Sequence, residues 1–104
     1  MPENWEVQFV GLRKEDEIDK VVAETAAGNS AEKISTLISN DLKLTVHVKT
    51  SSHTGGRKKY LVTSRMHSPG LFFEAKEEGW IFIQALEKSL KTLIAEVRKK
   101  IRKT

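Results

Sequence analysis

The sequence predicts an α+β fold: a four-stranded sheet with two helices packed on one face, in the order β-α-β-β-β-α. Two patterns predict it. Two long stretches repeat apolar residues every three or four positions, as one face of a helix does. Four shorter stretches alternate apolar and polar side chains or are rich in β-forming residues. The 104 residues are enough for one domain with one core, and we expect it to span residues 1–104.

The N-terminal third predicts the first strand and the first helix. Residues 5–9 alternate apolar and polar side chains, so we expect a half-buried strand there. Residues 13–40 have a helical pattern, and the acidic run 15–17 suits a helix N-terminus. The segment 28–30, Gly-Asn-Ser, is expected to break or kink this helix. The expected core face of the helix consists of Ile18, Val21, Val22, Ala26, Ile34, Leu37 and Ile38.

The middle of the chain predicts three strands. Residues 42–49 alternate strictly, whereas residues 51–56 are expected to form a flexible loop. Residues 59–66 form a second expected strand, and residues 71–76 form a third. Between these two, residues 68–71 have Pro and Gly in the central positions of a type II turn. The side chains expected to face the core from the first of these strands are Leu42, Leu44, Val46 and Val48.

The last helix is expected over residues 78–103, which consist mostly of good helix formers. Glu77 and Glu78 are expected in its first turn, where negative charge is favourable, rather than in an acid–base pair. Trp80 and Phe82 are expected to pack in the core or at its edge rather than to stack on bases. The apolar face of the helix consists of Ile83, Leu86, Leu90, Leu93, Ile94, Val97 and Ile101.

The net charge of +4 is unevenly divided along the chain. Residues 1–41 contain four basic and nine acidic residues, a balance of −5, whereas residues 42–104 contain fourteen basic and five acidic residues, a balance of +9. This division predicts one positive surface on the folded protein. Nucleic-acid phosphates are its expected partners, ahead of an anionic membrane.

Several classes of site are not expected. The absence of cysteine excludes disulfides and thiol chemistry and is compatible with a reducing cytoplasm. His47, His53 and His67 lack the spacing and the neighbouring ligands of a metal site. No catalytic constellation is present, so we expect neither an enzyme nor a cofactor nor a small-molecule substrate. No apolar run could span a bilayer and no signal peptide is recognisable, so we expect a cytoplasmic protein without a membrane partner.

Two basic features are candidate nucleic-acid contacts. One is a stripe along the last helix, and the other is the loop 53–59, where three positive charges adjoin glycine amides that can hold a phosphate. Each also has a plain interpretation, because basic residues suit the end and the wet face of a helix, and a hairpin loop needs no function. The candidate electrostatic contacts are Lys88, Lys91, Arg98, Lys99, Arg102 and Lys103 on the helix, with Arg57, Lys58, Lys59 and Arg65 from the sheet end.

The last third of the chain carries a recognisable motif. Residues 78–84 read Glu-Gly-Trp-Ile-Phe-Ile-Gln, residues 90–94 read Leu-Lys-Thr-Leu-Ile, and Arg98 follows. The run resembles the ribosome hibernation-promoting factors and ribosome-associated translation inhibitors, also called the sigma-54 modulation family. In that family an acidic, glycine-containing turn leads into a helix starting Asp-Met-Tyr-x-x-Ile-Asp, and Trp80 takes the aromatic position. The order of elements resembles that family over the whole chain.

The resemblance implies a non-enzymatic translation inhibitor that binds rRNA in the mRNA and tRNA channel of the small ribosomal subunit during stress. Ser89 and Thr92 depart from the family, which commonly has Lys and Arg there, and Glu96 replaces another basic position. The acidic first helix is a poor candidate for rRNA contact. The alternatives are a stand-alone double-stranded RNA-binding module and a protein–protein module, such as a homodimer that uses an exposed sheet edge.

Overall fold

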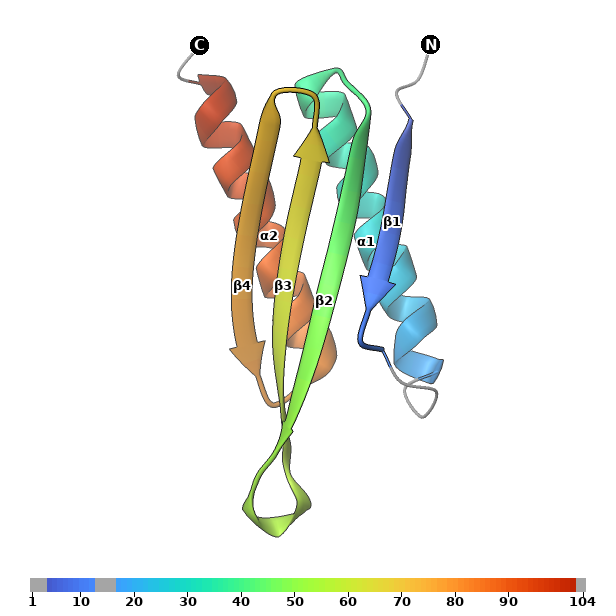
Figure 1. The fold of residues 1–104 in the computed structure, drawn as a ribbon, viewed down its shortest axis with the longest axis vertical. Coiled ribbons are helices and arrows are strands. Elements are labelled where there is room, and N and C mark those ends of the chain that lie inside the picture. Colours follow the sequence, from blue (N-terminus) through green and yellow to red (C-terminus); the bar gives the residue numbers. More distant parts are fainter. Residues whose placement is uncertain (1–3, 13–16, 103–104) are drawn as a thin grey trace.

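Four strands form one mixed sheet in the order of the sequence (Figure 1). The computed structural model describes residues 4–12 and 17–102. Strand β1 pairs in parallel with β2, whereas β2 with β3 and β3 with β4 pair antiparallel. The bounds are Trp5–Val10 for β1, Leu42–Ser52 for β2, Lys58–Ser68 for β3 and Leu71–Gly79 for β4.

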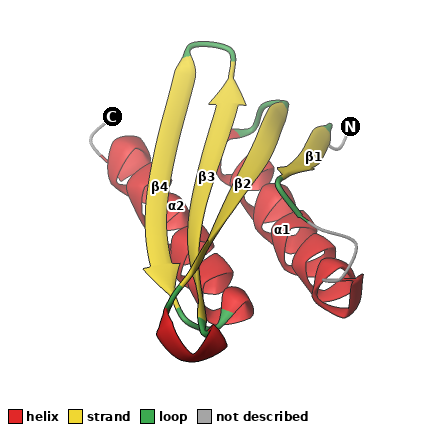
Figure 2. Cartoon of the chain, turned by 60° about the horizontal axis from the view of Figure 1, so that its bottom comes forward, coloured by secondary structure: helices red, strands yellow, loops and turns green. Residues whose placement is uncertain are grey.

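Two long helices cover one face of this sheet. Helix α1 spans Glu17–Ile38 and helix α2 spans Phe82–Arg102. They lie behind the sheet in Figure 1, and the tilted view of Figure 2 shows both on the same side of the strands. The predicted α+β fold, with its order β-α-β-β-β-α, is confirmed. The acidic run expected at the start of the first helix lies mostly outside the described residues.

The core lies between the sheet and the two helices. Strand β2 alternates as predicted: Leu44 and Val46 are fully buried, whereas Lys43 and Lys49 are exposed on the opposite face. The predicted apolar face of α2 is also confirmed for most of its length, although Ile101 is 37% exposed. The turn at residues 68–71 has the positive φ, 77° at Gly70, that a type II turn requires.

Helix α1 differs from the sequence-based expectation in two respects. It runs without a break through residues 28–30, so the predicted kink is wrong. Gly28 instead faces the indole of Trp5, and a Cβ there would lie 3.4 Å from the Trp5 Cη2 atom. Gly28 therefore lies where α1 packs against β1.

The predicted core face of α1 was also wrong in its first half. Val21 is 67% exposed and Val22 is 48% exposed, whereas Ala23, Ala27 and Ala31 are fully buried. These alanines recur at four-residue spacing and carry only a methyl group. They let the helix approach the sheet closely, and the larger valines remain outside.

Strand β4 is longer, and α2 shorter, than predicted. Pairing with β3 continues to Gly79, which faces Tyr60, and Glu78 faces Leu61. Glu77 and Glu78 therefore belong to an edge strand and not to the first turn of the last helix. The β2–β3 hairpin is likewise longer than expected, because β2 continues to Ser52 and only a short 3₁₀ turn at Thr54–Gly56 separates it from β3.

Candidate nucleic-acid interface

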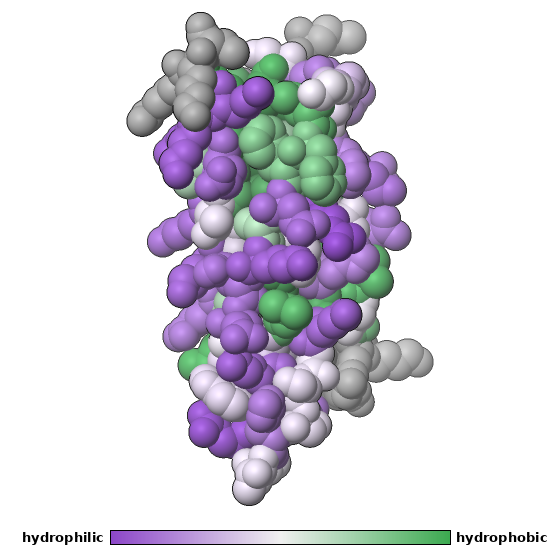
Figure 3. All heavy atoms as spheres, turned by 60° about the vertical axis from the view of Figure 1, so that its left-hand side comes forward, coloured by the Kyte–Doolittle hydropathy of each residue, from purple (hydrophilic) through white to green (hydrophobic). Residues whose placement is uncertain are grey.

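The outer face of α2 presents a row of exposed cations. Four of them, Lys88, Lys91, Arg98 and Lys99, have exposed side chains. At 3.6 residues per turn these four side chains occupy about 100° of the helix circumference. Figure 3 brings forward the side that carries β4 and α2, and hydrophilic residues cover most of it. The side chain of Arg102 and the whole of Lys103 lie outside the described residues.

Two of these four cations form ion pairs with acidic residues, and the other two form none within the described residues. Lys88 lies 3.7 Å from Glu77 on β4, and Lys99 lies 3.9 Å from Glu96 on the same helix. Both lysines are more than 70% exposed, so these ion pairs are weak and easily exchanged. Within the described part of the chain, Lys91 and Arg98 have no ion-pair partner. Of the four, they are therefore the cations most available to an outside anion.

The tip of the β2–β3 hairpin carries the second group of cations, and Trp80 anchors it. The guanidinium carbon of Arg57 lies 4.1 Å from the centroid of the Trp80 ring, a cation–π contact. The Lys59 ammonium lies 5.3 Å from the same ring, and the His53 ring lies edge-on at 5.1 Å. Trp80 is 42% exposed, so the residue expected to pack at the core edge instead holds the hairpin tip against the start of α2.

The loop at this tip is closed by its own backbone. The His53 N–H donates a 2.7 Å hydrogen bond to the Arg57 carbonyl oxygen. Gly55 and Gly56 both have positive φ, 81° and 75°, a conformation that side-chain-bearing residues rarely adopt. Lys58 is exposed next to this turn. The predicted juxtaposition of glycines and cations is thus present at the end of the molecule.

Arg65 lies on the other face of the sheet, away from α2. Its Nε atom donates a 2.7 Å hydrogen bond to Oε2 of Glu74, and its Nη1 atom lies 3.5 Å from Nε2 of His47. The hydrogen bond from Arg65 holds the pKa of the Glu74 carboxyl below its usual value. Arg65 is therefore committed to an internal pair, and the structure does not bring it together with the other candidates.

The two groups of cations follow the long axis of the protein, which extends 49 Å. The hairpin tip meets Trp80, which lies just before α2 begins, whereas Arg98 and Lys99 lie near the other end of a helix about 30 Å long. Lys88 and Lys91 lie between them. The candidate surface that α2 and the hairpin share is therefore an elongated strip, not a compact pocket.

The departures from the family pattern differ in their structural setting. Ser89 is fully buried, and its hydroxyl oxygen lies 2.8 Å from that of Ser64 and 3.1 Å from the Ala75 carbonyl oxygen. A basic side chain could not be accommodated there, so Ser89 is a core residue and not a lost contact. Thr92 and Glu96 are exposed.

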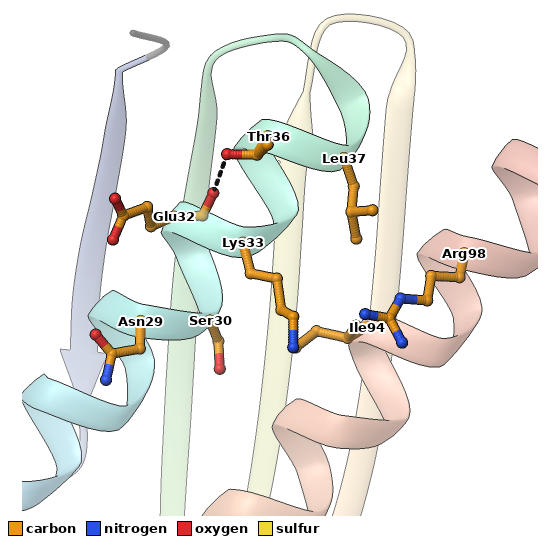
Figure 4. A pocket seen from close by; sticks show the side chains of 8 residues that line it. All are labelled: Asn29, Ser30, Glu32, Lys33, Thr36, Leu37, Ile94 and Arg98. Atoms are coloured by element: carbon orange, nitrogen blue, oxygen red, sulfur yellow. Dashed lines mark hydrogen bonds between the residues drawn. The ribbon is translucent and has the colours of Figure 1, made fainter.

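One candidate contact was missed by sequence reasoning. Lys33 of α1 and Arg98 of α2 line the same groove between the two helices (Figure 4). The acidic composition of α1 argued against rRNA contact by this helix. Composition alone does not show which side chain of a helix lies beside the neighbouring helix. Trp80 stood out in the sequence, but its contact with Arg57 was not predictable, because this contact depends on how far the β2–β3 hairpin extends.

Other kinds of site find little support in the described residues. No group of three or more His, Asp or Glu side chains in that part of the chain could hold a metal ion. No helix in the same part is long and apolar enough to cross a membrane.

The fold resembles that of solved proteins. Over 93% of this chain and 97% of the other, the structure superposes on the Thermus thermophilus Protein Y N-terminal domain with a TM-score of 0.64 and 14% sequence identity. The chain has the fold of the Protein Y N-terminal domain. A Coxiella burnetii ribosomal subunit interface protein matches with a TM-score of 0.49 and 13% identity over 93% of this chain and 96% of the other. No family model matches the sequence, and no curated protein matches it either.

The similarity to the Protein Y domain confirms the resemblance stated from the sequence at the level of the fold. It extends over nearly the whole of both chains, so the strands and both helices are shared. At 14% identity the similarity concerns the backbone arrangement, and the side chains of the candidate interface must be judged on their own geometry.

Proposed function

We propose that this protein is a non-enzymatic ribosome-binding factor of the hibernation type, acting in the cytoplasm. The observation that carries the proposal is the combination of a Protein Y-like fold with a row of exposed cations on the outer face of α2, two of which have no ion-pair partner among the described residues. Protein Y belongs to the hibernation factors. The proposed partner is the small ribosomal subunit, with rRNA phosphates as the groups that are bound.

The proposed contact surface is the strip formed by α2 and the hairpin tip. Lys91 and Arg98 would bind phosphates directly, because no acid neutralises them in the described chain. Lys88 and Lys99 would exchange weak ion pairs for phosphates. Arg57 and Lys58 would add contacts at the far end. A rigid strip of this kind suits a structured RNA that is recognised by its shape.

The proposed mechanism is occupancy. A protein held by phosphates in the mRNA and tRNA channel excludes both ligands, and no chemical step is needed. Because the contacts are electrostatic, counterions are released from the RNA on binding, and affinity depends steeply on salt. In stress, when mRNA and tRNA are scarce, such a protein would keep idle subunits inactive.

Co-sedimentation of the purified protein with isolated small subunits across a salt series tests this proposal. If about five phosphates are neutralised, log affinity should fall against log salt with a slope of roughly −3.5 to −4.5. Prior loading of the channel with mRNA and tRNA should prevent binding. Absence of binding at low salt contradicts the proposal, and equally tight binding to naked duplex RNA would favour a double-stranded RNA-binding module instead.

Strand β4 favours a second candidate, a homodimer. It pairs only with β3 in the described chain, so one edge of a nine-residue strand has unpaired backbone groups. Phe72 on this strand is 54% exposed. An edge of this length can pair with the same edge of a second copy. Self-association in sedimentation that does not respond to salt, without affinity for small subunits, would support this candidate.

A further inference from the structure

The groove between α1 and α2 brings two cations from different helices together. It has a volume of about 580 Å³, and Figure 4 shows the side chains of Lys33 and Arg98 extending into it from opposite sides. Leu37 and Ile94 also line this groove, one on each helix, and give it apolar surface. The groove is therefore apolar where the helices meet and positively charged at both walls.

Neither cation is neutralised within the part of the chain that the structure describes, where neither Lys33 nor Arg98 forms an ion pair. Glu32 lines the same groove, but Figure 4 shows its carboxylate on the far side of α1, away from Lys33. Two like charges that share a groove repel each other. An anion bound between them is attracted to both and offsets this repulsion. The arrangement is thus suited to an anionic group.

A backbone phosphate of RNA suits this groove. Its charge is shared by two non-bridging oxygens, each with more than one lone pair, so the planar guanidinium of Arg98 can bind both oxygens from one wall while the ammonium of Lys33 binds one of them from the other. The apolar side chains beside the cations suit the sugar that adjoins a phosphate in RNA. Arg98 also belongs to the strip on α2, so the groove continues that strip.

We propose that the α1–α2 groove binds one backbone phosphate of RNA between the Lys33 ammonium and the Arg98 guanidinium. This inference rests on the proposed function and deepens it. It assigns to α1, the acidic helix, one specific contact. It also turns the interface from a strip on one helix into a surface that spans two helices.

A double-mutant cycle tests whether the two cations share a phosphate. Lys33→Gln, Arg98→Gln and the double variant are compared for binding to small subunits at several salt concentrations. Each single variant should bind about ten-fold more weakly, in the range of a charge-assisted hydrogen bond. If both cations bind the same phosphate, their contributions to affinity are not independent. The loss of affinity in the double variant should therefore be smaller than about one hundred-fold, the product of the two single effects. Its salt slope should be shallower by roughly 0.7–0.9, the value for one phosphate.

Lys20→Gln is the matched control. Lys20 is an exposed lysine on the same helix, but it lines a different groove beside β1. It should bind as the unchanged protein does. Circular dichroism and thermal melting should show all four variants folded, since Lys33 and Arg98 are exposed.

The outcomes separate the two proposals. If the unchanged protein binds small subunits but Lys33→Gln binds equally well, the groove is not a phosphate site and the proposed function stands. A strictly multiplicative double variant, with a slope reduced by two phosphates, would mean that each cation binds its own phosphate. If the unchanged protein does not bind, the proposed function fails and this inference fails with it.

Discussion

The hydroxyl oxygen of Ser89 lies 2.8 Å from that of Ser64, in the fully buried contact between α2 and β3. Ser89 also lies 3.1 Å from the Ala75 carbonyl oxygen of β4. One small polar side chain on α2 thus connects the helix to two strands. These contacts fix how the helix is rotated, and the rotation decides which of its cations face outward.

Replacing this serine tests that rotation. Ser89→Ala should lower the free energy of unfolding by about 1–3 kcal/mol, because the buried Ser64 hydroxyl loses its partner. Ser89→Lys, the family-like residue, should destabilise the fold far more, since it would bury an unpaired charge. Denaturant unfolding measures both. A Ser89→Lys protein as stable as the original would show that α2 can rotate to expose this position.

Charge reversal at Lys91 and Arg98 tests the outer face of α2. The double variant Lys91→Glu, Arg98→Glu should bind small subunits at least about one hundred-fold more weakly, while its melting temperature changes little. Lys100→Glu is the control, because Lys100 is exposed but lies about 200° around the helix from Arg98. Unchanged co-sedimentation of the folded double variant would refute the assignment of this face.

Trp80 should position the hairpin tip rather than stabilise the fold. Trp80→Ala removes the ring on which Arg57 rests, at a cost to stability of about 0.5–1 kcal/mol for the cation–π contact. The amides of Gly55 and Gly56 should then become more mobile in ¹⁵N relaxation, and binding to small subunits should weaken. Trp80→Phe keeps an aromatic face and should restore both properties in part. Equal mobility in all three proteins would contradict this role.

Two glycines should respond in opposite directions to the same substitution. Gly28→Ala should stabilise the protein by about 0.5–1 kcal/mol, because alanine favours a helix and its methyl group would make an ordinary 3.4 Å contact with Trp5. Gly11→Ala should destabilise it, because Gly11 has a φ of 96° and a Cβ there would clash with the Val48 carbonyl oxygen. Thermal melting of the two variants measures both effects. A destabilised Gly28→Ala protein would mean that the Trp5 indole cannot move to accommodate the added methyl group.

The Arg65–Glu74 pair should make stability depend on acid pH. The pKa of Glu74 is lower in the folded protein, so the stabilisation is fully present above the unfolded value of about 4.3. It is lost as the pH falls through the lower folded value. An NMR titration of the Glu74 carboxyl should show this lowered pKa, and Arg65→Met should return it toward the ordinary value. A pKa that does not respond to Arg65→Met would assign the shift to another group.

The elements with a strong pattern were predictable from sequence. The strict alternation of β2 and the long apolar face of α2 each bury the side chains expected of them. Helix α1 was harder because its core contacts are made by alanines, which carry little pattern, while its valines point outward. The end of β4 was hard to predict for a related reason. Without knowledge of the partner strand, Glu77 and Glu78 suit the first turn of a helix as well as the end of a strand.

The candidate interface was predictable only in part. The row of cations on α2 follows from helical periodicity, which a sequence displays directly. The contact of Trp80 with Arg57 and the meeting of Lys33 with Arg98 depend on how separate elements are placed relative to one another. Arg65 shows the converse, because a strand residue shares a face with its cross-strand neighbour Glu74 and not with a helix on the other side.

The parallel pairing of β1 with β2 has a consequence for how the chain reaches this structure. Trp5 pairs with Leu42 across the whole of α1, whereas β2, β3 and β4 are joined by two hairpins. Closing a short hairpin costs less chain entropy than closing a long loop, so the hairpins should form early and β1 should dock late. Strand β1 is then synthesised before the other three strands but docks after them.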